Sequence, residues 1–234
     1  MEGVKPAVEL DLSQRTLREV NDYLHHKISE HKGLTVEILN PAGAHGIAVG
    51  LDAPVSVHVR GHAGYYVAGM NKRASVTVHG NAGTGVAENI MSGTVRIKGN
   101  ASTGAAASGQ GGLVVIEGYA SSRCGISMKG CDIVVGGNVG HVSGFMAQAG
   151  RLVVCGDAGA GLGDSLYEAV IYVRGKIHGL GADAREEPMT ETDRASVAEL
   201  LKKAGFEQDP GEFKRVASAR TLYHWNAEHR GAYG

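Results

Sequence analysis

The sequence predicts an all-β solenoid: a right-handed parallel β-helix of about seven to eight coils, with an N-terminal helix and a C-terminal helical tail. Two observations support this. The apolar/polar alternation of strands recurs every 19 residues, and glycine makes up 36 of the 234 residues. A fixed period near this length, combined with strand-like alternation, is typical of a solenoid in which each copy of the repeat forms one coil stacked on its neighbours.

The repeat runs without insertion through seven copies. In each copy a glycine is preceded, two and four residues earlier, by Val, Ile or Leu, as in "VTVHG" and "VRIKG". Positions two apart in a strand face the same side, so these residues predict two stacked, inward-facing aliphatic ladders. A degenerate copy, "VEILNPAG", stands upstream with an offset of 21 residues. We number the coils 1 to 7 from the repeated glycines, which are Gly61, Gly80, Gly99, Gly118, Gly137, Gly156 and Gly175.

Small residues fill further columns of the repeat. One such column begins with Ala68, Ala87 and Ala106, and we expect it to form a corner where the chain turns tightly. The residue after the repeated glycine is often Asn or Asp, which we interpret as a turn with unusual backbone dihedrals; it is Asn81, Asn100, Asn138 and Asp157 in coils 2, 3, 5 and 6. A hexapeptide β-helix is excluded because three hexads per coil do not make a period of 19 residues.

Three segments follow from this organisation: an N-terminal strand and helix cap over 1–33, the β-helix over 34–181, and a C-terminal helical segment and tail over 182–234. An open solenoid exposes strand edges, so caps are expected at both ends. In the first cap, apolar residues follow Ser13, the predicted N-cap, at helical spacing, and Gly33 would end the element; they are Leu17, Val20, Leu24 and Ile28.

Two helices are predicted after the coils. "ASVAELLKKAGF" has the amphipathic pattern of a helix that stops at Gly205. "DPGEFKRVASA" predicts a second helix, with Asp209 as its cap and Pro210 in its first turn.

Charge and composition exclude several classes of function. The formal net charge is -1, from 23 basic and 24 acidic residues, so no electrostatic attraction to nucleic acid or to an anionic membrane is expected. No apolar run approaches the roughly 18 residues of a membrane span, and the N-terminus lacks the apolar segment of a signal peptide. The three cysteines favour a reducing cytoplasm.

No catalytic, cofactor-binding or metal-ligating residue is predicted. His58, His62 and His79 lie on neighbouring coils, but outward-facing histidines on a strand are usually solvated. The spacing of Cys124, Cys131 and Cys155 matches no common iron–sulfur pattern. The glycine clusters precede further coils and not a helix, so they do not make a phosphate-binding loop.

One outward column is apolar and marks a candidate interface. It contains Val115, Val134, Val153 and Tyr172 on coils 4 to 7, whereas the same column is polar on coils 1 to 3. An exposed apolar stripe of this kind implies a covering partner. Two coverings are open: the chain's own C-terminal helix, through Val197, Leu200 and Leu201, or another subunit. Tyr223 and Trp225 in the tail are further candidates for contact with a partner, and packing on the chain's own helices is their alternative.

Several stretches resemble a known domain family. "NPAGAHGIAVGL" and "RGHAGYYVAGMNKRASVTVHGNAG" are similar to the C-terminal GXGXG domain of glutamate synthase large subunits, and "DLSQRTLREVNDYLHHKIS" is similar to the segment before it. The resemblance covers roughly residues 8 to 180. It implies a right-handed β-helix that organises catalytic parts while holding no catalytic residue and no flavin.

As a free-standing chain with the tail "FKRVASARTLYHW", the sequence is most similar to the small glutamate-synthase-like subunits of N-methylglutamate synthases. That resemblance implies two partners: a class II glutamine-amidotransferase-like subunit, and an FMN-dependent synthase subunit with an iron–sulfur cluster. The implied reaction converts methylamine and glutamate to N-methylglutamate and ammonia. A subunit of an ordinary glutamate synthase is one alternative. The β-helical subunit of a formylmethanofuran dehydrogenase or formyltransferase/hydrolase complex is another.

Overall fold

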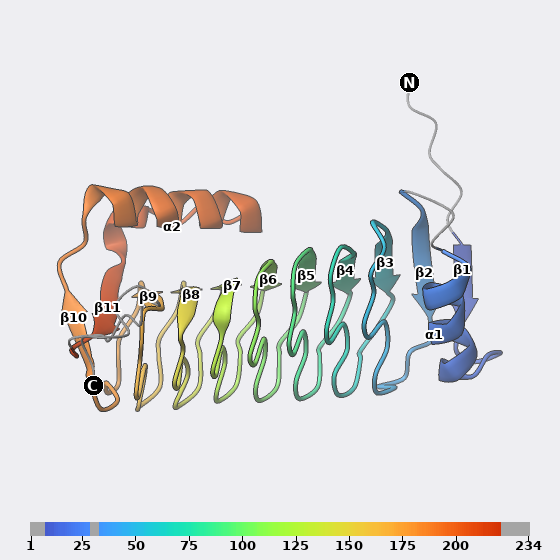
Figure 1. Ribbon diagram of the computed structural model, residues 1–234, viewed down its shortest axis with the longest axis horizontal. Coiled ribbons are helices and arrows are strands. Elements are labelled where there is room, and N and C mark those ends of the chain that lie inside the picture. Colours follow the sequence, from blue (N-terminus) through green and yellow to red (C-terminus); the bar gives the residue numbers. More distant parts are fainter. Residues whose placement is uncertain (1–7, 29–32, 221–234) are drawn as a thin grey trace, which may run out of the picture.

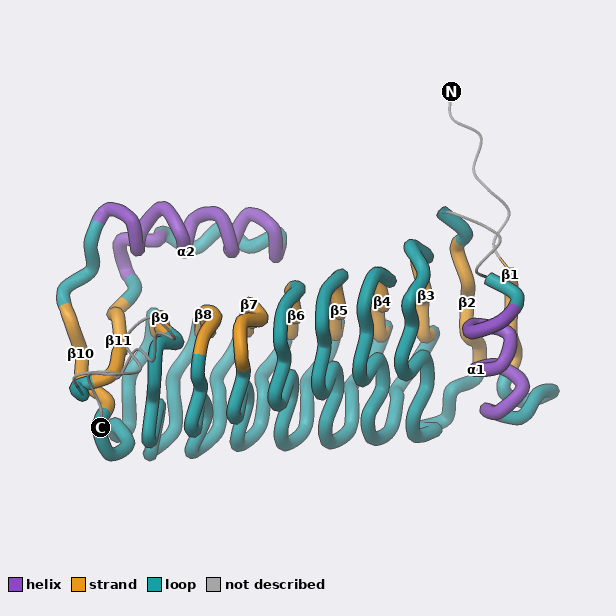
Figure 2. Tube along the Cα trace, viewed as in Figure 1, coloured by secondary structure: helices purple, strands orange, loops and turns teal. Residues whose placement is uncertain are grey.

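The computed structural model describes residues 8–28 and 33–220. It shows a parallel β-solenoid of about seven turns, with one helix at the N-terminal end and one helix near the C-terminal end (Figure 1). Most of each coil is loop and turn, with one short strand per coil aligned along the same side of the rod (Figure 2). The predicted fold class is confirmed.

The strands of the coils form one continuous parallel ladder. Val57 pairs with Val76, and this step of 19 residues repeats through every later coil. The upstream copy also joins the sheet, because Val36 pairs with Val57 at the offset of 21 residues. The strands are β2 (Thr35–Leu39), β3 (Ser56–Val59), β4 (Ser75–Val78), β5 (Thr94–Ile97), β6 (Leu113–Ile116), β7 (Lys129–Val135), β8 (Ala149–Val154) and β9 (Val170–Val173).

Both predicted aliphatic ladders line the inside of the rod. The column that contains Val57 and Val95 and the column that contains Val59 and Ile97 are fully buried in every coil. Each of these side chains packs between its equivalents on the coils above and below. The core is therefore a stack of small aliphatic layers, which explains why a chain with 5% aromatic residues can build it.

The repeated glycine is required by the close approach of successive coils. A Cβ atom on Gly99 would lie 2.3 Å from Asn81 Oδ1 and 2.9 Å from the carbonyl oxygen of Gly80. Asn81 Oδ1 accepts a hydrogen bond at 2.9 Å from the backbone N–H of Asn100, one coil further on, and Asn100 Oδ1 accepts one from Tyr119. The asparagines thus form a side-chain ladder. None of Asn81, Asn100 and Asn138 has a positive φ, so the turn-dihedral interpretation of this column was wrong.

A run of six turn residues follows in coils 1 to 5, at positions 65–70 of coil 1 and their equivalents; we call it the turn run. Its second, fourth and sixth residues have left-handed backbone dihedrals. In coil 1 these are Tyr66, Ala68 and Met70, with φ of 60°, 54° and 54°. The small column that contains Ala68 is buried at this corner, as predicted.

The N-terminal cap consists of β1 (Val8–Asp11), which pairs in parallel with β2, and α1 (Leu17–His26). The N-cap of α1 is Thr16, which forms a capping box with Glu19, so the prediction of Ser13 was wrong by three positions. The helix also ends before Gly33, at a C-cap on Lys27. Thr16 is a better N-cap than Ser13 because a Glu follows Thr16 at the third helical position, where it completes the capping box.

The C-terminal cap contains β10 (Ala184–Glu187), α2 (Glu191–Ala204), the 3₁₀ turn η1 (Pro210–Glu212) and β11 (Lys214–Ser218). Gly205 ends α2 with a left-handed φ of 75°, as predicted. The second predicted helix was wrong. Asp209 caps only the short turn η1, and the next residues form β11, which pairs antiparallel with both β9 and β10. The last coil leaves a strand edge unpaired, and backbone pairing with β11 covers it.

Candidate functional site

The apolar outward column lies beneath the chain's own helix. α2 runs along the solenoid on the outer side of its last coils (Figure 1). Val115, Val134 and Val153 are fully buried and Tyr172 is 3% exposed. They form a second hydrophobic core together with residues of α2 and the segment after it: Val197, Leu200, Leu201, Ala204 and Phe213. Of the two predicted coverings, the structure shows the chain's own helix. These four residues therefore form a contact within the chain, with α2 and the segment after it. Tyr223 and Trp225 lie outside the described residues.

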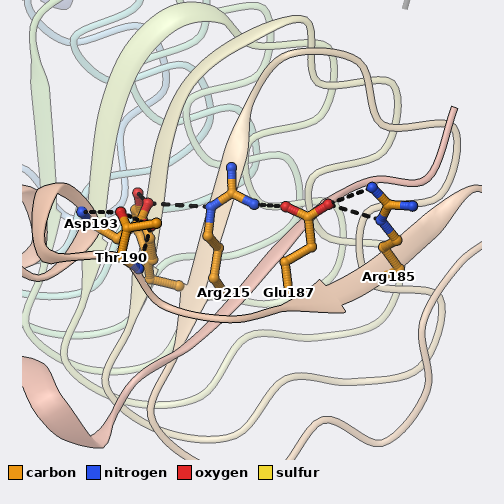
Figure 3. A network of polar contacts seen from close by, with 6 residues as sticks. Arg185, Glu187, Thr190, Asp193 and Arg215 are labelled. Carbon is orange, nitrogen blue, oxygen red and sulfur yellow. Dashed lines mark hydrogen bonds and ion pairs between the residues drawn. The ribbon is translucent and has the colours of Figure 1, made fainter. Parts of the chain in front are cut away.

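A chain of polar contacts anchors the N-terminal end of α2 (Figure 3). The Tyr172 hydroxyl donates a hydrogen bond of 2.7 Å to Asp193 Oδ1, while the other oxygen of Asp193 accepts bonds from the backbone N–H and hydroxyl of Thr190. Arg215 bridges Asp193 and Glu187. Burial and then the bond to Asp193 raise the pKa of Tyr172. Burial acts to raise the pKa of Asp193, but its hydrogen bonds hold that pKa below the usual value.

A pocket of about 680 Å³ opens beside this network and is lined by Glu187, Thr190, Asp193 and Arg215, among others. These side chains already satisfy one another through the contacts just described. The pocket is therefore part of the anchoring of α2.

On coils 1 and 2 the outer sheet face is polar, and neither described helix lies over it (Figure 1). Arg60 pairs with Glu37 and contacts His79, and His79 Nε2 lies 3.0 Å from His58 Nδ1. Burial and then the nearby Arg60 lower the pKa of His79. His62 does not join this group, because its Nδ1 accepts a hydrogen bond from the backbone N–H of Asn81.

The cysteines are buried thiols. Burial raises the pKa of Cys124 and of Cys131 to about 12, and that of Cys155 to about 11. A thiol that stays protonated at neutral pH is a poor nucleophile and a poor metal ligand. Within residues 8–28 and 33–220, no group of three or more His, Cys, Asp or Glu side chains is placed to hold a metal ion.

The sequence reasoning missed an exposed aromatic and apolar group in the turn run of coil 1. Tyr65 and Tyr66 are half exposed, and Met70 is 47% exposed. The Tyr65 ring stacks on His45 with ring centroids 4.4 Å apart, and Tyr66 meets Tyr65 edge-on. A signal was present in the sequence, since the column of Tyr66 contains glycine in coils 2, 3 and 6, where the backbone is left-handed.

Comparison with known proteins gives one strong relationship. Protein GlxC of Rhizobium meliloti (strain 1021) is 56% identical to this chain over 225 residues, which cover 96% of this chain and 99% of Protein GlxC. The chain belongs to the GlxC family. No family model matches the chain, so the resemblance of this GlxC-family protein to the GXGXG domain stays a prediction.

The GlxC-family relationship extends beyond the coils. An alignment over 96% of the chain takes in most of both caps as well as the repeat. The unit shared with Protein GlxC is therefore the capped solenoid. Among the described residues of this GlxC-family chain, neither helix has the length and apolar character needed to cross a bilayer.

Proposed function

We propose that this chain is a non-catalytic structural subunit of a glutamate-synthase-type complex in the cytoplasm. The observation that carries the proposal is the state of its reactive side chains. The thiols are buried with raised pKa values, and the carboxylates and arginines of the outer sheet face pair with one another. What remains is a rod of seven coils, roughly 35 Å long at about 4.8 Å per coil. Such a rod suits the role of holding other chains at a constant separation.

The finer proposal is N-methylglutamate synthase, and it rests on the sequence resemblance. The partners are a class II glutamine-amidotransferase-like subunit and an FMN-dependent synthase subunit with an iron–sulfur cluster. The complex converts methylamine and glutamate to N-methylglutamate and ammonia. The FMN and the iron–sulfur cluster are proposed to lie in the synthase subunit. This chain only holds the other subunits in position.

The test is a pull-down of the tagged full chain from its native cell, followed by mass spectrometry and a visible absorption spectrum. Recovery of an amidotransferase-like chain and a yellow flavoprotein supports the proposal. Recovery of formyltransferase-type partners assigns the chain to the alternative complex. A colourless chain without partners contradicts both. The control is the tagged Val95→Asp variant, whose core ladder carries a buried charge and which should capture neither partner.

The reaction is then assayed on the purified complex. N-methylglutamate formation should require all three chains, and this chain alone should form none. A complex that prefers ammonia to methylamine as the amine, and that forms glutamate, would be an ordinary glutamate synthase instead.

A further inference from the structure

The turn runs of coils 1 to 5 carry a symmetric pattern that the proposed function does not use. Coil 1 presents Tyr66 and Met70, and coil 5 presents Val142 and Met146 at the same two positions of the repeat. Met70 is 47% and Met146 is 39% exposed. We call the surface formed by the turn runs of coils 1 to 5 the turn face. Both of its ends, on coils 1 and 5, are therefore apolar. The two apolar ends are separated by coils 2 to 4, so they form two small patches.

The turn face is charged between its apolar ends. Glu88 on coil 2 and Arg123 on coil 4 both lie on it. Within the part of the chain that the structure describes, neither side chain has a hydrogen bond or ion pair. Coil 3, midway between them, presents only small residues: Gly104, Ala107 and Ser108.

The Tyr66 ring and the Glu88 carboxylate lie together over Gly85 and fill the space above it. A Cβ atom on Gly85 would lie 2.6 Å from Tyr66 Cδ1 and 2.9 Å from Glu88 Oε2. An exposed aromatic ring beside a free carboxylate is suited to contact with a guanidinium group, which is attracted to both. Arg123 stands two coils further along the column of Gly85.

Bulky side chains on left-handed backbone occur at the same positions. In the column of Gly85 the backbone is left-handed in every coil from 1 to 6, yet three coils carry a side chain there: Tyr66, Arg123 and Val142, with φ of 60°, 60° and 57°. A bulky or β-branched residue in this region is unusual, and strain of this kind is often retained for function.

We propose that the turn face binds a second copy of this chain, in a two-fold dimer whose axis crosses the solenoid at coil 3. This rotation reverses the order of the coils and keeps each column opposite itself. Coil 1 then meets coil 5, coil 2 meets coil 4, and coil 3 meets coil 3. Tyr66 lies against Val142 of the partner copy and Met70 against its Met146. Arg123 of the partner copy packs on the exposed Tyr66 ring and pairs with Glu88 beside it, and the small residues of coil 3 allow the two rods to approach closely.

The first experiment is sedimentation velocity on the full chain over a range of concentrations. Wild type should form a dimer. Glu88→Arg and Arg123→Glu should each weaken association by about tenfold or more, because each variant places like charges together at a buried contact. The double variant E88R/R123E should restore association, since it recreates both pairs with the charges exchanged. Lys202→Glu, an exposed change on α2, is the matched charge-reversal control and should behave as wild type.

A second experiment tests the register with engineered thiols, since the native cysteines are buried. Ser108→Cys on coil 3 should cross-link to itself across the axis. Asn89→Cys and Ser127→Cys should not cross-link alone, but a mixture of the two should, because coils 2 and 4 face each other. All three positions already have left-handed backbone and tolerate a non-glycine residue.

Three outcomes overturn the proposal: a wild-type chain that stays monomeric at all concentrations, a dimer indifferent to the charge reversals, or cross-links in another pattern. A monomer whose Glu88→Arg variant loses another protein in the pull-down would assign the face to that protein instead. The proposal goes beyond the scaffold role and does not rest on it, since self-association is measured on this chain alone.

Discussion

Arg96 donates a hydrogen bond of 3.0 Å to the carbonyl oxygen of Ala204, 108 residues further along the chain. The same guanidinium pairs with Glu117 at 2.9 Å. Arg96 therefore stands where the polar part of the outer sheet face ends and the part beneath α2 begins. It satisfies one of the carbonyl groups that the last turn of a helix leaves without a partner.

Neighbouring substitutions on β5 separate the two faces of the strand. Val95→Asp should destabilise the chain by more than about 4 kcal/mol, because it buries an unpaired charge in the inner ladder. Arg96→Asp, which alternation alone predicts to be tolerated, should instead cost about 1–3 kcal/mol, since it removes the bond to Ala204 and adds a carboxylate beside Glu117. Urea unfolding of both variants measures the difference. Equal effects would mean that the inward and outward assignments are wrong.

The N-terminal cap depends on one amide side chain. Asn21 donates to the carbonyl oxygen of Gly46 at 2.8 Å and accepts from the N–H of Ala48 at 3.0 Å, two backbone groups of the coil that precedes coil 1. Asn21→Ala should lower the free energy of unfolding by about 1–3 kcal/mol, because both groups lose their partner.

The matched control for the cap is Asp22→Ala. Asp22 is the next residue of α1, its side chain is 61% exposed, and within residues 8–28 and 33–220 it pairs with His26 alone. Exposed pairs contribute little, so this variant should stay within about 0.5 kcal/mol of wild type. The loss of stability in the two variants is measured by thermal unfolding. Equal losses would show that the bonds of Asn21 do not stabilise the cap.

Gly99 tests the requirement for close approach between coils. Its backbone is not left-handed, so the effect of Gly99→Ala should be steric, and a loss of about 3 kcal/mol or more is expected because the neighbouring backbone must move. At Gly104 a Cβ atom meets nothing within 4 Å, although φ is 71°. Gly104→Ala should therefore lose only about 1 kcal/mol, from strain. Calorimetry should rank the variants in this order, and the reverse order would contradict the stacking argument.

Stability should depend on His79 in weakly acidic solution. The pKa of His79 is lowered in the folded chain, first by burial and then by Arg60, from a usual value of 6.5. Below that value the unfolded chain binds a proton that the folded chain resists, so the contribution of neutral His79 is present above pH 6.5 and is lost as pH falls toward the folded pKa.

The measurement is the melting temperature of wild type and His79→Gln across this pH range. Wild type should lose more stability on acidification than His79→Gln. Glu37, Arg60, His58 and Lys98 also surround the ring, so the comparison is made at constant ionic strength. Parallel curves for the two proteins would show that His79 does not titrate differently on folding. His26→Gln, an exposed change on α1, is the control and should follow wild type.

Strictly periodic features could be predicted from the sequence. The inward ladders of Val57 and Val59, the parallel stacking and the corner at Ala68 all follow from a period that places equivalent residues in equivalent surroundings. Local capping rules found Gly205 as the end of α2. They misplaced the start of α1 at Ser13, because Ser13 and Thr16 are both acceptable caps and only the second has Glu three residues later.

Features that lack a periodic neighbour could not be predicted in this way. "KRVAS" becomes β11 because the last coil presents an unpaired strand edge. Nothing in the local sequence shows that this edge lies next to the segment. The Asn81 ladder was visible as a column, yet its cause is a hydrogen bond to the next coil and not the shape of the turn. Tyr66 was visible too, but its exposure depends on how the turn run is oriented.

The repeat alone predicts that this chain is a parallel solenoid, because seven equivalent copies can satisfy their strand edges and bury their aliphatic residues only by stacking on one another. It also predicts that Val115, Val134, Val153 and Tyr172 must be covered, since they form an apolar stripe on an outer face. That α2 is the cover follows only from the folded structure. A stripe of valines accepts any apolar helix, and the contacts of Tyr172 with Asp193 and of Arg96 with Ala204, which hold α2 in place, join residues far apart in the chain.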